Sequence, residues 1–121
     1  MNQFNQKLEQ IANLPDNWDG YGACIIPEKV LENTETVLEK VIFTEKELLE
    51  DLDMYPNPNG TISFIYDKNN YIMNLEIGII NHSLYISKNN EVLIYKNEEI
   101  HDYTYRSLKI YIRKYILNKY S

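Results

Sequence analysis

The stretch NGTISFIYDKNNYIMNLEI, residues 59–77, decides the fold because its apolar side chains recur at every second position. This period is that of a β-strand with one buried face. Asn59-Gly60 and Lys68-Asn69-Asn70 are turn signals on either side of the first run, so the stretch predicts an antiparallel hairpin. We expect the second run to continue to Ile80. The expected buried side comprises Ile62, Phe64, Tyr66, Met73, Leu75, Ile77 and Ile79.

Shorter strands are predicted on both sides of this hairpin. After a turn at Asn81-His82 we expect strands over residues 84–88 and 91–95, joined by Asn89-Asn90. Residues 52–57 form an edge strand at best, because Pro56 and Pro58 lack the N–H that a central strand donates. Short turns between neighbouring strands indicate an antiparallel meander of three to five strands.

Apolar residues at a helical period predict three helices, over residues 2–13, 27–43 and 103–119. Two helices therefore precede the strands and one follows them. Strands that cluster along the chain indicate an α+β fold, with the helices on one face of the sheet. The expected buried helical residues are Phe4, Leu8, Ile11, Val30, Leu31, Thr34, Val37, Leu38, Val41, Ile42, Tyr105, Leu108, Ile112, Tyr115 and Ile116.

The chain has 121 residues, which predicts a single domain over 1–121. Residues 1–7 lack the basic and apolar regions of a signal peptide, and no window is apolar enough for a membrane span. We therefore expect a cytoplasmic protein without a membrane partner.

Charge is distributed unevenly along the chain. The net charge of −6 is made up of −8 over residues 1–53, −3 over 54–102 and +5 over 103–121. A largely acidic surface makes nucleic acid an unlikely partner, since nucleic-acid binding needs phosphate-neutralising cations. In the last helix Arg106, Lys109 and Arg113 form one stripe, with Ile110 and Leu117 beside it. This stripe is a docking surface for a partner, a contact for nucleic acid, or a set of cations that suit a helix C-terminus and neighbour the acidic helix face at Glu28–Glu39.

Residues suited to catalysis are few. Cys24, His82 and His101 could form a Cys-His pair, but nothing in their spacing places them together. Cys24 precedes two isoleucines, so we expect it to be buried. The histidines and the cysteine lack zinc-site spacing, and no glycine-rich phosphate loop is present. The sequence therefore predicts a non-enzymatic protein without a metal or cofactor.

The loop over residues 16–26 has the most specific sequence. In a structural interpretation Trp18 fills the core, Asp19 binds backbone amides and the loop turns on Gly20 and Gly22. Pro27 then opens the next helix. In a functional interpretation Trp18, Asp19 and Tyr21 recognise a partner, because Trp and Tyr often anchor protein interfaces.

The string Leu14-Pro15-Asp16-Asn17-Trp18-Asp19-Gly20-Tyr21-Gly22-Ala23, with Pro27 after it, resembles a loop in a family of small uncharacterised bacterial and phage proteins. The resemblance continues through Pro56, Pro58, Gly60, Ile62 and Phe64 to Leu75, Glu76, Ile77 and Gly78, and so spans residues 14–78. The chain differs from the family in having Tyr66 near the position of a Trp and in its basic C-terminal helix. The resemblance implies this order of elements and no catalytic activity.

These observations favour a protein-binding module over an enzyme. The small size, acidic charge and abundance of Tyr and Asn suit an inhibitor-type partner, such as an antitoxin, an immunity protein or an anti-defence protein of a mobile element. Two alternatives remain open. One is a self-assembling structural protein that forms a homodimer through a sheet edge or the last helix. The other is a small-ligand sensor with the aromatic loop over a pocket.

Overall fold

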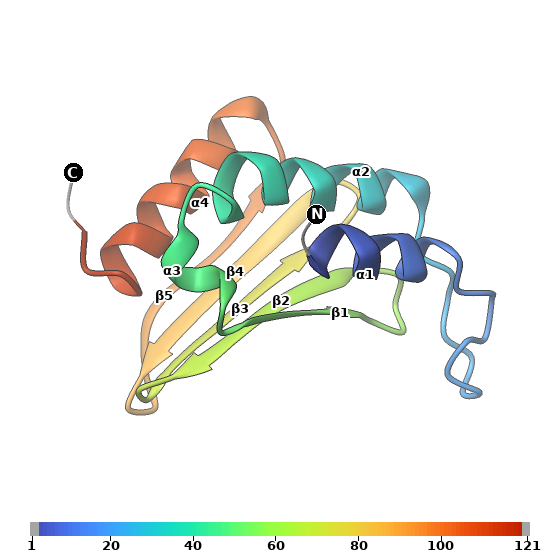
Figure 1. The fold of residues 1–121 in the computed structure, drawn as a ribbon, viewed down its shortest axis with the longest axis horizontal. Coiled ribbons are helices and arrows are strands. Elements are labelled where there is room, and N and C mark those ends of the chain that lie inside the picture. The colour runs from blue at the N-terminus through green and yellow to red at the C-terminus, as the bar shows by residue number, and fades with distance from the viewer. Residues whose placement is uncertain (1–2, 120–121) are drawn as a thin grey trace.

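The computed structural model describes residues 3–119 and shows an α+β fold (Figure 1). The expected order of helices, strands and a final helix is confirmed. In chain order the elements are α1 (Gln3–Ala12), α2 (Glu28–Val37), the π-helical turn η1 (Leu38–Ile42), α3 (Lys46–Leu49), β1 (Leu52–Pro56), β2 (Ile62–Lys68), β3 (Tyr71–Ile77), β4 (Asn81–Lys88), β5 (Glu91–Glu99) and α4 (Asp102–Tyr115).

The five strands form one antiparallel meander in the order β1-β2-β3-β4-β5. Phe64 on β2 lies opposite both Met54 on β1 and Leu75 on β3, and Leu75 in turn lies opposite Leu84 on β4. These side chains share the face that the helices cover (Figure 1), and all are fully buried. The opposite face is open and carries Tyr55, Ile72 and Tyr95 as exposed side chains.

Two of the hairpin turns are built from pairs of asparagines. Asn69-Asn70 and Asn89-Asn90 all have φ between 50° and 68°, in the left-handed region. Asn tolerates this conformation better than other side chains with a Cβ, and two such residues in succession suit the right-handed twist of adjacent strands. The predicted turns at these positions are confirmed.

The helices cover the sheet with the predicted stripes. On α2 and η1 the buried residues include Val30, Thr34, Leu38 and Val41, whereas Leu31, and Tyr115 on α4, are only partly buried. α4 ends earlier than the predicted 103–119 range, at Tyr115. The reason is local, because Asn118 adopts a left-handed φ of 56° and the Lys119 N–H donates to the Arg113 carbonyl oxygen.

Several local predictions are wrong. β3 ends at Ile77 rather than at the predicted Ile80, and β4 and β5 are longer than the predicted 84–88 and 91–95. Asn81 and His82 are not a turn but the first residues of β4, because the turn lies two residues earlier, at Ile79-Ile80. Ile79 is therefore exposed rather than part of the buried row. Cys24 is exposed, since it lies in the loop before α2 and not under a helix. The edge position of β1 is as predicted.

Candidate functional site

Three segments that are distant in sequence meet at one end of the sheet. They are the loop over residues 16–26, the turn over 57–61 and the turn over 78–81. The Cys24 N–H donates to the Pro58 carbonyl oxygen at 2.8 Å, which attaches the loop to the 57–61 turn. Gly60 has φ of 90°, and a Cβ there would lie 3.5 Å from Pro27 Cδ. The positive φ is what favours glycine here, since a Cβ at this distance from Pro27 would be in ordinary van der Waals contact.

The loop over 16–26 is held in shape mainly by its own polar groups. Asp19 Oδ1 accepts hydrogen bonds from the backbone N–H groups of Tyr21 at 2.8 Å and Ala23 at 3.1 Å. Asn17 Oδ1 accepts from the Gly22 N–H, and the Asn17 N–H donates to the Ala23 carbonyl oxygen. These contacts agree with the predicted role of Asp19. Gly20 and Gly22 adopt φ of 77° and 89°, which agrees with their predicted role in the turn.

Trp18 does not fill the core, so the structural interpretation of this residue is wrong. Its ring is partly exposed, and its Nε1–H donates to the Cys24 carbonyl oxygen at 2.9 Å, closing the loop on itself. Tyr21 lies further out, with 93% of its surface exposed. The loop forms a projection from the body of the molecule beyond α1 (Figure 1). Tyr21 is thus free to contact a partner, whereas the indole of Trp18 is used to shape the loop.

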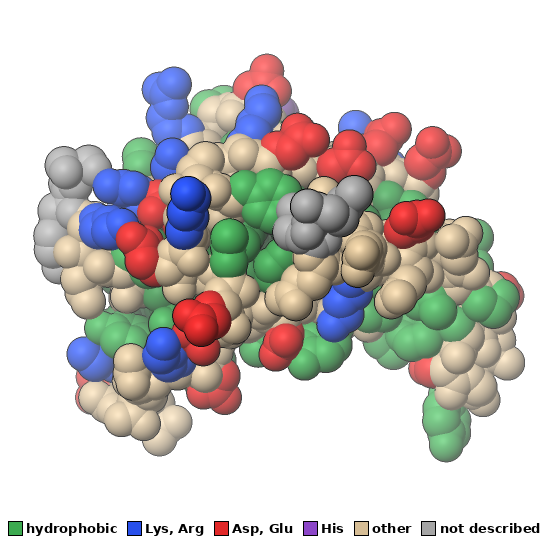
Figure 2. Space-filling view, viewed as in Figure 1, with side chains coloured by type: hydrophobic (Ala, Val, Ile, Leu, Met, Phe, Trp, Pro, Cys, Tyr) green, Lys and Arg blue, Asp and Glu red, His purple; other side chains and the backbone are tan. Residues whose placement is uncertain are grey.

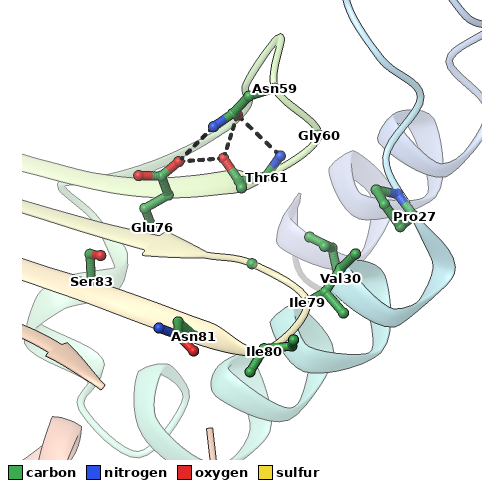
Figure 3. Close-up of a pocket in the computed structure, with 11 residues that line it drawn as sticks. Pro27, Val30, Asn59, Gly60, Thr61, Glu76, Ile79, Ile80, Asn81 and Ser83 are labelled. Carbon is green, nitrogen blue, oxygen red and sulfur yellow. Dashed lines mark hydrogen bonds between the residues drawn. The ribbon is translucent and has the colours of Figure 1, made fainter. Parts of the chain in front are cut away.

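A pocket of about 500 Å³ lies beside this loop, between the two turns and the start of α2 (Figure 3). Its apolar wall comes from Pro27, Val30, Ile79 and Ile80. The remaining lining residues are Asn59, Gly60, Thr61, Glu76, Gly78, Asn81 and Ser83. Trp18 and Tyr21 do not line it. The volume lies within the range of ligand pockets, roughly 300–1,000 Å³.

Glu76 is the one charged group in the lining of this pocket. Its Oε2 accepts a hydrogen bond of 2.6 Å from the Thr61 hydroxyl and a longer one of 3.4 Å from the Asn59 amide (Figure 3). The Thr61 hydroxyl in turn accepts from the Asn57 amide at 2.9 Å. A hydroxyl that accepts from one group and donates to a carboxylate connects them into a network, which fixes the carboxylate in place.

The opposite wall is a turn whose residues are unusual for a turn. Ile79 and Ile80 are both exposed, Ile80 by 64%, where Gly, Asn, Asp or Ser would be the ordinary choice. The Gly78 N–H donates to the Asn81 carbonyl oxygen, and buried Asn33 on α2 donates to the carbonyl oxygens of Gly78 and Ile79. The turn is therefore held in one conformation while it presents two isoleucines to solvent.

The predicted residues of the last helix lie elsewhere. α4 is at the end of the molecule opposite to the projecting loop, so the two predicted halves of a partner-binding surface do not come together (Figure 1). Arg106 and Ile110 are exposed, and Lys109 and Leu117 are half-buried. Leu117 follows the end of α4 rather than extending its stripe.

Arg113 is engaged within the molecule. Its Nη1 donates to Glu45 Oε1 at 2.6 Å, and the Glu45 side chain is only 2% exposed. Lys119 Nζ lies 2.6 Å from Glu47 Oε1, which lowers the pKa of Glu47. The acidic neighbours of Arg113 and Lys119 are therefore beside α3 and not on the Glu28–Glu39 face. Figure 2 shows acidic side chains gathered along α2 and basic ones toward α4.

The cysteine and the histidines form no common site. Within residues 3–119, no hydrogen bond joins the Cys24 thiol to either imidazole. His82 is 1% exposed and lies opposite Glu98, and neither of its ring nitrogens has a hydrogen-bond partner in that part of the chain. Burial lowers the pKa of His82, and the nearby Glu98 carboxylate opposes this shift. His101 lies on the surface, 3.4 Å from Glu99 and stacked on Tyr103.

Two searches of the described part of the chain give negative results. Residues 3–119 contain no group of three or more His, Cys, Asp or Glu side chains placed to hold a metal ion. None of the helices described there has the length and apolar character that a membrane span requires. Comparison of the chain with models of protein families, with curated proteins and with solved structures finds no match.

Proposed function

We propose that this chain is a non-enzymatic protein-binding module of the inhibitor type, in the class of antitoxins, immunity proteins and anti-defence proteins. The observation that carries the proposal is a set of exposed apolar side chains at the loop and turn that border the pocket. We call it the loop–turn surface, and it consists of Tyr21, Ile25, Ile79 and Ile80. Partner binding would bury these side chains.

The rigidity of the loop–turn surface supports a role in binding. Asp19 and Trp18 fix the backbone of the loop, and Asn33 fixes the backbone of the Ile79-Ile80 turn, so less backbone entropy is lost on association. Tyr21 is also one of the residue types enriched at interface hot spots.

The charge of the chain indicates the kind of partner. Glu28, Glu32, Glu35 and Glu39 are all exposed along α2 and η1, and the chain as a whole carries −6. An acidic inhibitor is attracted to a basic partner by long-range electrostatics, which raises the association rate at low salt. We therefore propose a basic protein as the partner, bound at or near its own functional surface.

Co-purification from the cells that naturally make this chain tests the proposal. Tagged full-length chain is compared with a Tyr21→Ser/Ile80→Ser double variant and with a Tyr103→Ser control. Tyr103 is 66% exposed on α4, so the control removes one exposed aromatic side chain from a different region. We expect the wild type and the control to retain one stoichiometric basic protein at low salt and the double variant to lose it. Absence of any stoichiometric partner, or retention of it by the double variant, would refute the proposal.

Self-assembly is a second candidate function because the outer edge of β5 pairs with no strand within residues 3–119. Tyr95 on this strand is exposed beside Tyr85, its cross-strand neighbour on the open face. An unpaired edge can pair with a second copy of the same strand. Light scattering over a wide concentration range distinguishes the two functions, since a monomer at every concentration removes self-assembly.

A further inference from the structure

Glu76 is a carboxylate without a counter-ion among residues 3–119. It is partly buried on β3, and within residues 3–119 no Lys, Arg or His side chain forms an ion pair with it. Its contacts are with the neutral groups of Thr61 and Asn59. A half-buried carboxylate attracts a cation more strongly than a fully exposed one does, because the local dielectric constant is lower than in water.

The carboxylate also retains capacity to accept hydrogen bonds. An ionised carboxylate offers about four acceptor sites, and the two contacts of Glu76 are both made by Oε2. Figure 3 shows the other oxygen without a contact. Because Thr61 and Asn59 hold one side of the group, its free side has a defined direction. Such a group suits a donor with fixed geometry better than a mobile, fully hydrated ion.

The apolar wall restricts the class of ligand further. Ile79 and Ile80 are exposed and line the pocket together with Glu76, so a ligand that fills it combines a cationic end with an apolar body. A phosphate or carboxylate would be repelled by Glu76, and a purely apolar group would leave this charge desolvated and unpaired. The guanidinium of Arg meets both demands, because its planar fork can bind a carboxylate and it is less strongly hydrated than an ammonium.

We infer that this pocket receives an arginine side chain from the basic partner, with the guanidinium on Glu76 and the aliphatic stem against Ile79 and Ile80. This inference deepens the proposed function and rests on it, because the proposed function identifies the protein that supplies the arginine. The sign of the chain's charge supports it, since a partner steered toward an acidic protein presents basic side chains.

NMR titration of the full-length chain tests the pocket without the natural partner. The probe is acetyl-Gly-Arg-Gly-amide, and the matched neutral probe carries citrulline in place of arginine. We expect saturable shifts of the Glu76, Ile79 and Ile80 amides with a millimolar dissociation constant. The citrulline probe should not bind, and the corresponding lysine probe should bind more weakly. Equal binding of arginine and citrulline would overturn the inference.

Variants separate the pocket from general electrostatic attraction. Glu76→Gln keeps an acceptor for Thr61 and Asn59 but removes the charge, and should weaken the arginine probe at least tenfold. Ile80→Ser should weaken binding of the arginine probe several-fold, because it removes part of the apolar wall. If Glu76→Gln does not fold, the Ile80→Ser variant tests the pocket in its place. Glu35→Gln removes an exposed charge from α2 and should leave binding unchanged. An equal loss in Glu35→Gln and Glu76→Gln would overturn the inference.

The outcomes also distinguish this inference from the proposed function. If the arginine probe binds as described but native cells yield no partner, the pocket assignment stands and the proposed function fails. If a partner is captured equally by wild type and Glu76→Gln, the proposed function stands and the arginine pocket fails.

Discussion

The side-chain amide of Asn33 on α2 donates a hydrogen bond of 2.9 Å to the carbonyl oxygen of Gly78, 45 residues later in the chain. The same amide nitrogen donates to the Ile79 carbonyl oxygen at 3.0 Å. One buried polar side chain thus links the helical layer to the turn that forms a wall of the pocket. The local conformation of that turn depends on a residue that is only 4% exposed and does not line the pocket.

Asn33→Leu should destabilise the protein and weaken binding at the pocket. Loss of the amide leaves two partly buried carbonyl oxygens without their donor, which costs about 1–3 kcal/mol of unfolding free energy. The turn then loses its fixed conformation, so the arginine probe should bind more weakly as well. Urea denaturation measures the first effect, with Glu35→Gln expected within about 0.5 kcal/mol of wild type. A variant as stable as wild type would contradict this account of Asn33.

Arg113→Met should be among the most destabilising substitutions on α4. It leaves the buried Glu45 carboxylate with Lys119 as a neighbour at 3.9 Å, and removal of one partner of a buried pair costs about 3–5 kcal/mol. Arg106→Met, on the same helix and exposed, should change stability by less than about 0.5 kcal/mol. Equal denaturation midpoints for the two variants would contradict the assignment of Arg113 to Glu45.

The double variant Glu45→Leu/Arg113→Met separates two causes of the destabilisation by Arg113→Met. One is the lost attraction between Arg113 and Glu45, and the other is the desolvation of the Glu45 carboxylate that is left without Arg113. Replacement of a buried ion pair by apolar side chains is often neutral or stabilising. We therefore expect the double variant to recover most of the stability that Arg113→Met loses. A double variant no more stable than Arg113→Met alone would show that another contact of Arg113 dominates.

Stability should fall as the pH is lowered through the ordinary pKa of histidine, near 6.5, because of His82. Burial lowers its pKa in the native state, so below pH 6.5 the unfolded chain binds this proton more readily than the folded chain does. One such group contributes a slope of at most about 1.4 kcal/mol per pH unit, and the slope ends below the native pKa. Above pH 7.5 the contribution is constant.

His82→Gln should remove this part of the pH dependence between pH 5.5 and 7.5, whereas His101→Gln should preserve it. His101 is the matched control because it lies on the surface. Urea denaturation at several pH values measures both slopes. Persistence of the wild-type slope in His82→Gln would assign the effect to other groups.

Asp19→Ala should loosen the loop over residues 16–26 without unfolding the rest of the chain. The carboxylate is the hydrogen-bond acceptor for the Tyr21 and Ala23 amides, and bonds to charged groups contribute about 1.5–3 kcal/mol each. Hydrogen exchange of these two amides should accelerate at least tenfold. Amides of β3, such as that of Leu75, should exchange as in wild type.

Asp16→Ala, an exposed change in the same loop, should leave the exchange of both amides unaltered. The Tyr21 amide is the more informative of the two because its side chain is the most exposed part of the loop–turn surface. Unchanged exchange at Tyr21 in Asp19→Ala would mean that the loop is held by other contacts.

The parts of the fold that could be predicted from sequence are those set by local pattern. Alternation at Ile62, Phe64 and Leu75 predicts the sheet face, because successive side chains of a strand point to opposite sides. The asparagine pairs predict turns since they tolerate positive φ. Each of these signals is contained within a few residues, so it can be recognised without knowledge of the tertiary structure.

The candidate site could be predicted only in part, because contacts between distant segments form it. Tyr21 and Asp19 belong to a motif that is visible in the sequence. Glu76 has the pattern of an ordinary strand residue, and only the tertiary structure shows that Thr61 and Asn59 contact it. The Ile79-Ile80 turn lacks ordinary turn residues. The alternating apolar pattern therefore predicts a strand that continues through it. A signal did exist at Asn33, a polar residue adjacent to the buried positions Val30 and Thr34 of its helix.

The meander has a consequence for how the molecule folds. Every strand pairs with its neighbour in sequence, so the entropy lost in closing each hairpin is small and the sheet has low contact order. The end of the sheet that carries the candidate site requires the closure of longer chain loops, because Cys24 must reach Pro58 and Asn33 must reach Gly78. We expect the central hairpins to form the folding nucleus and the site end to assemble on a preformed sheet, so that substitutions there chiefly accelerate unfolding.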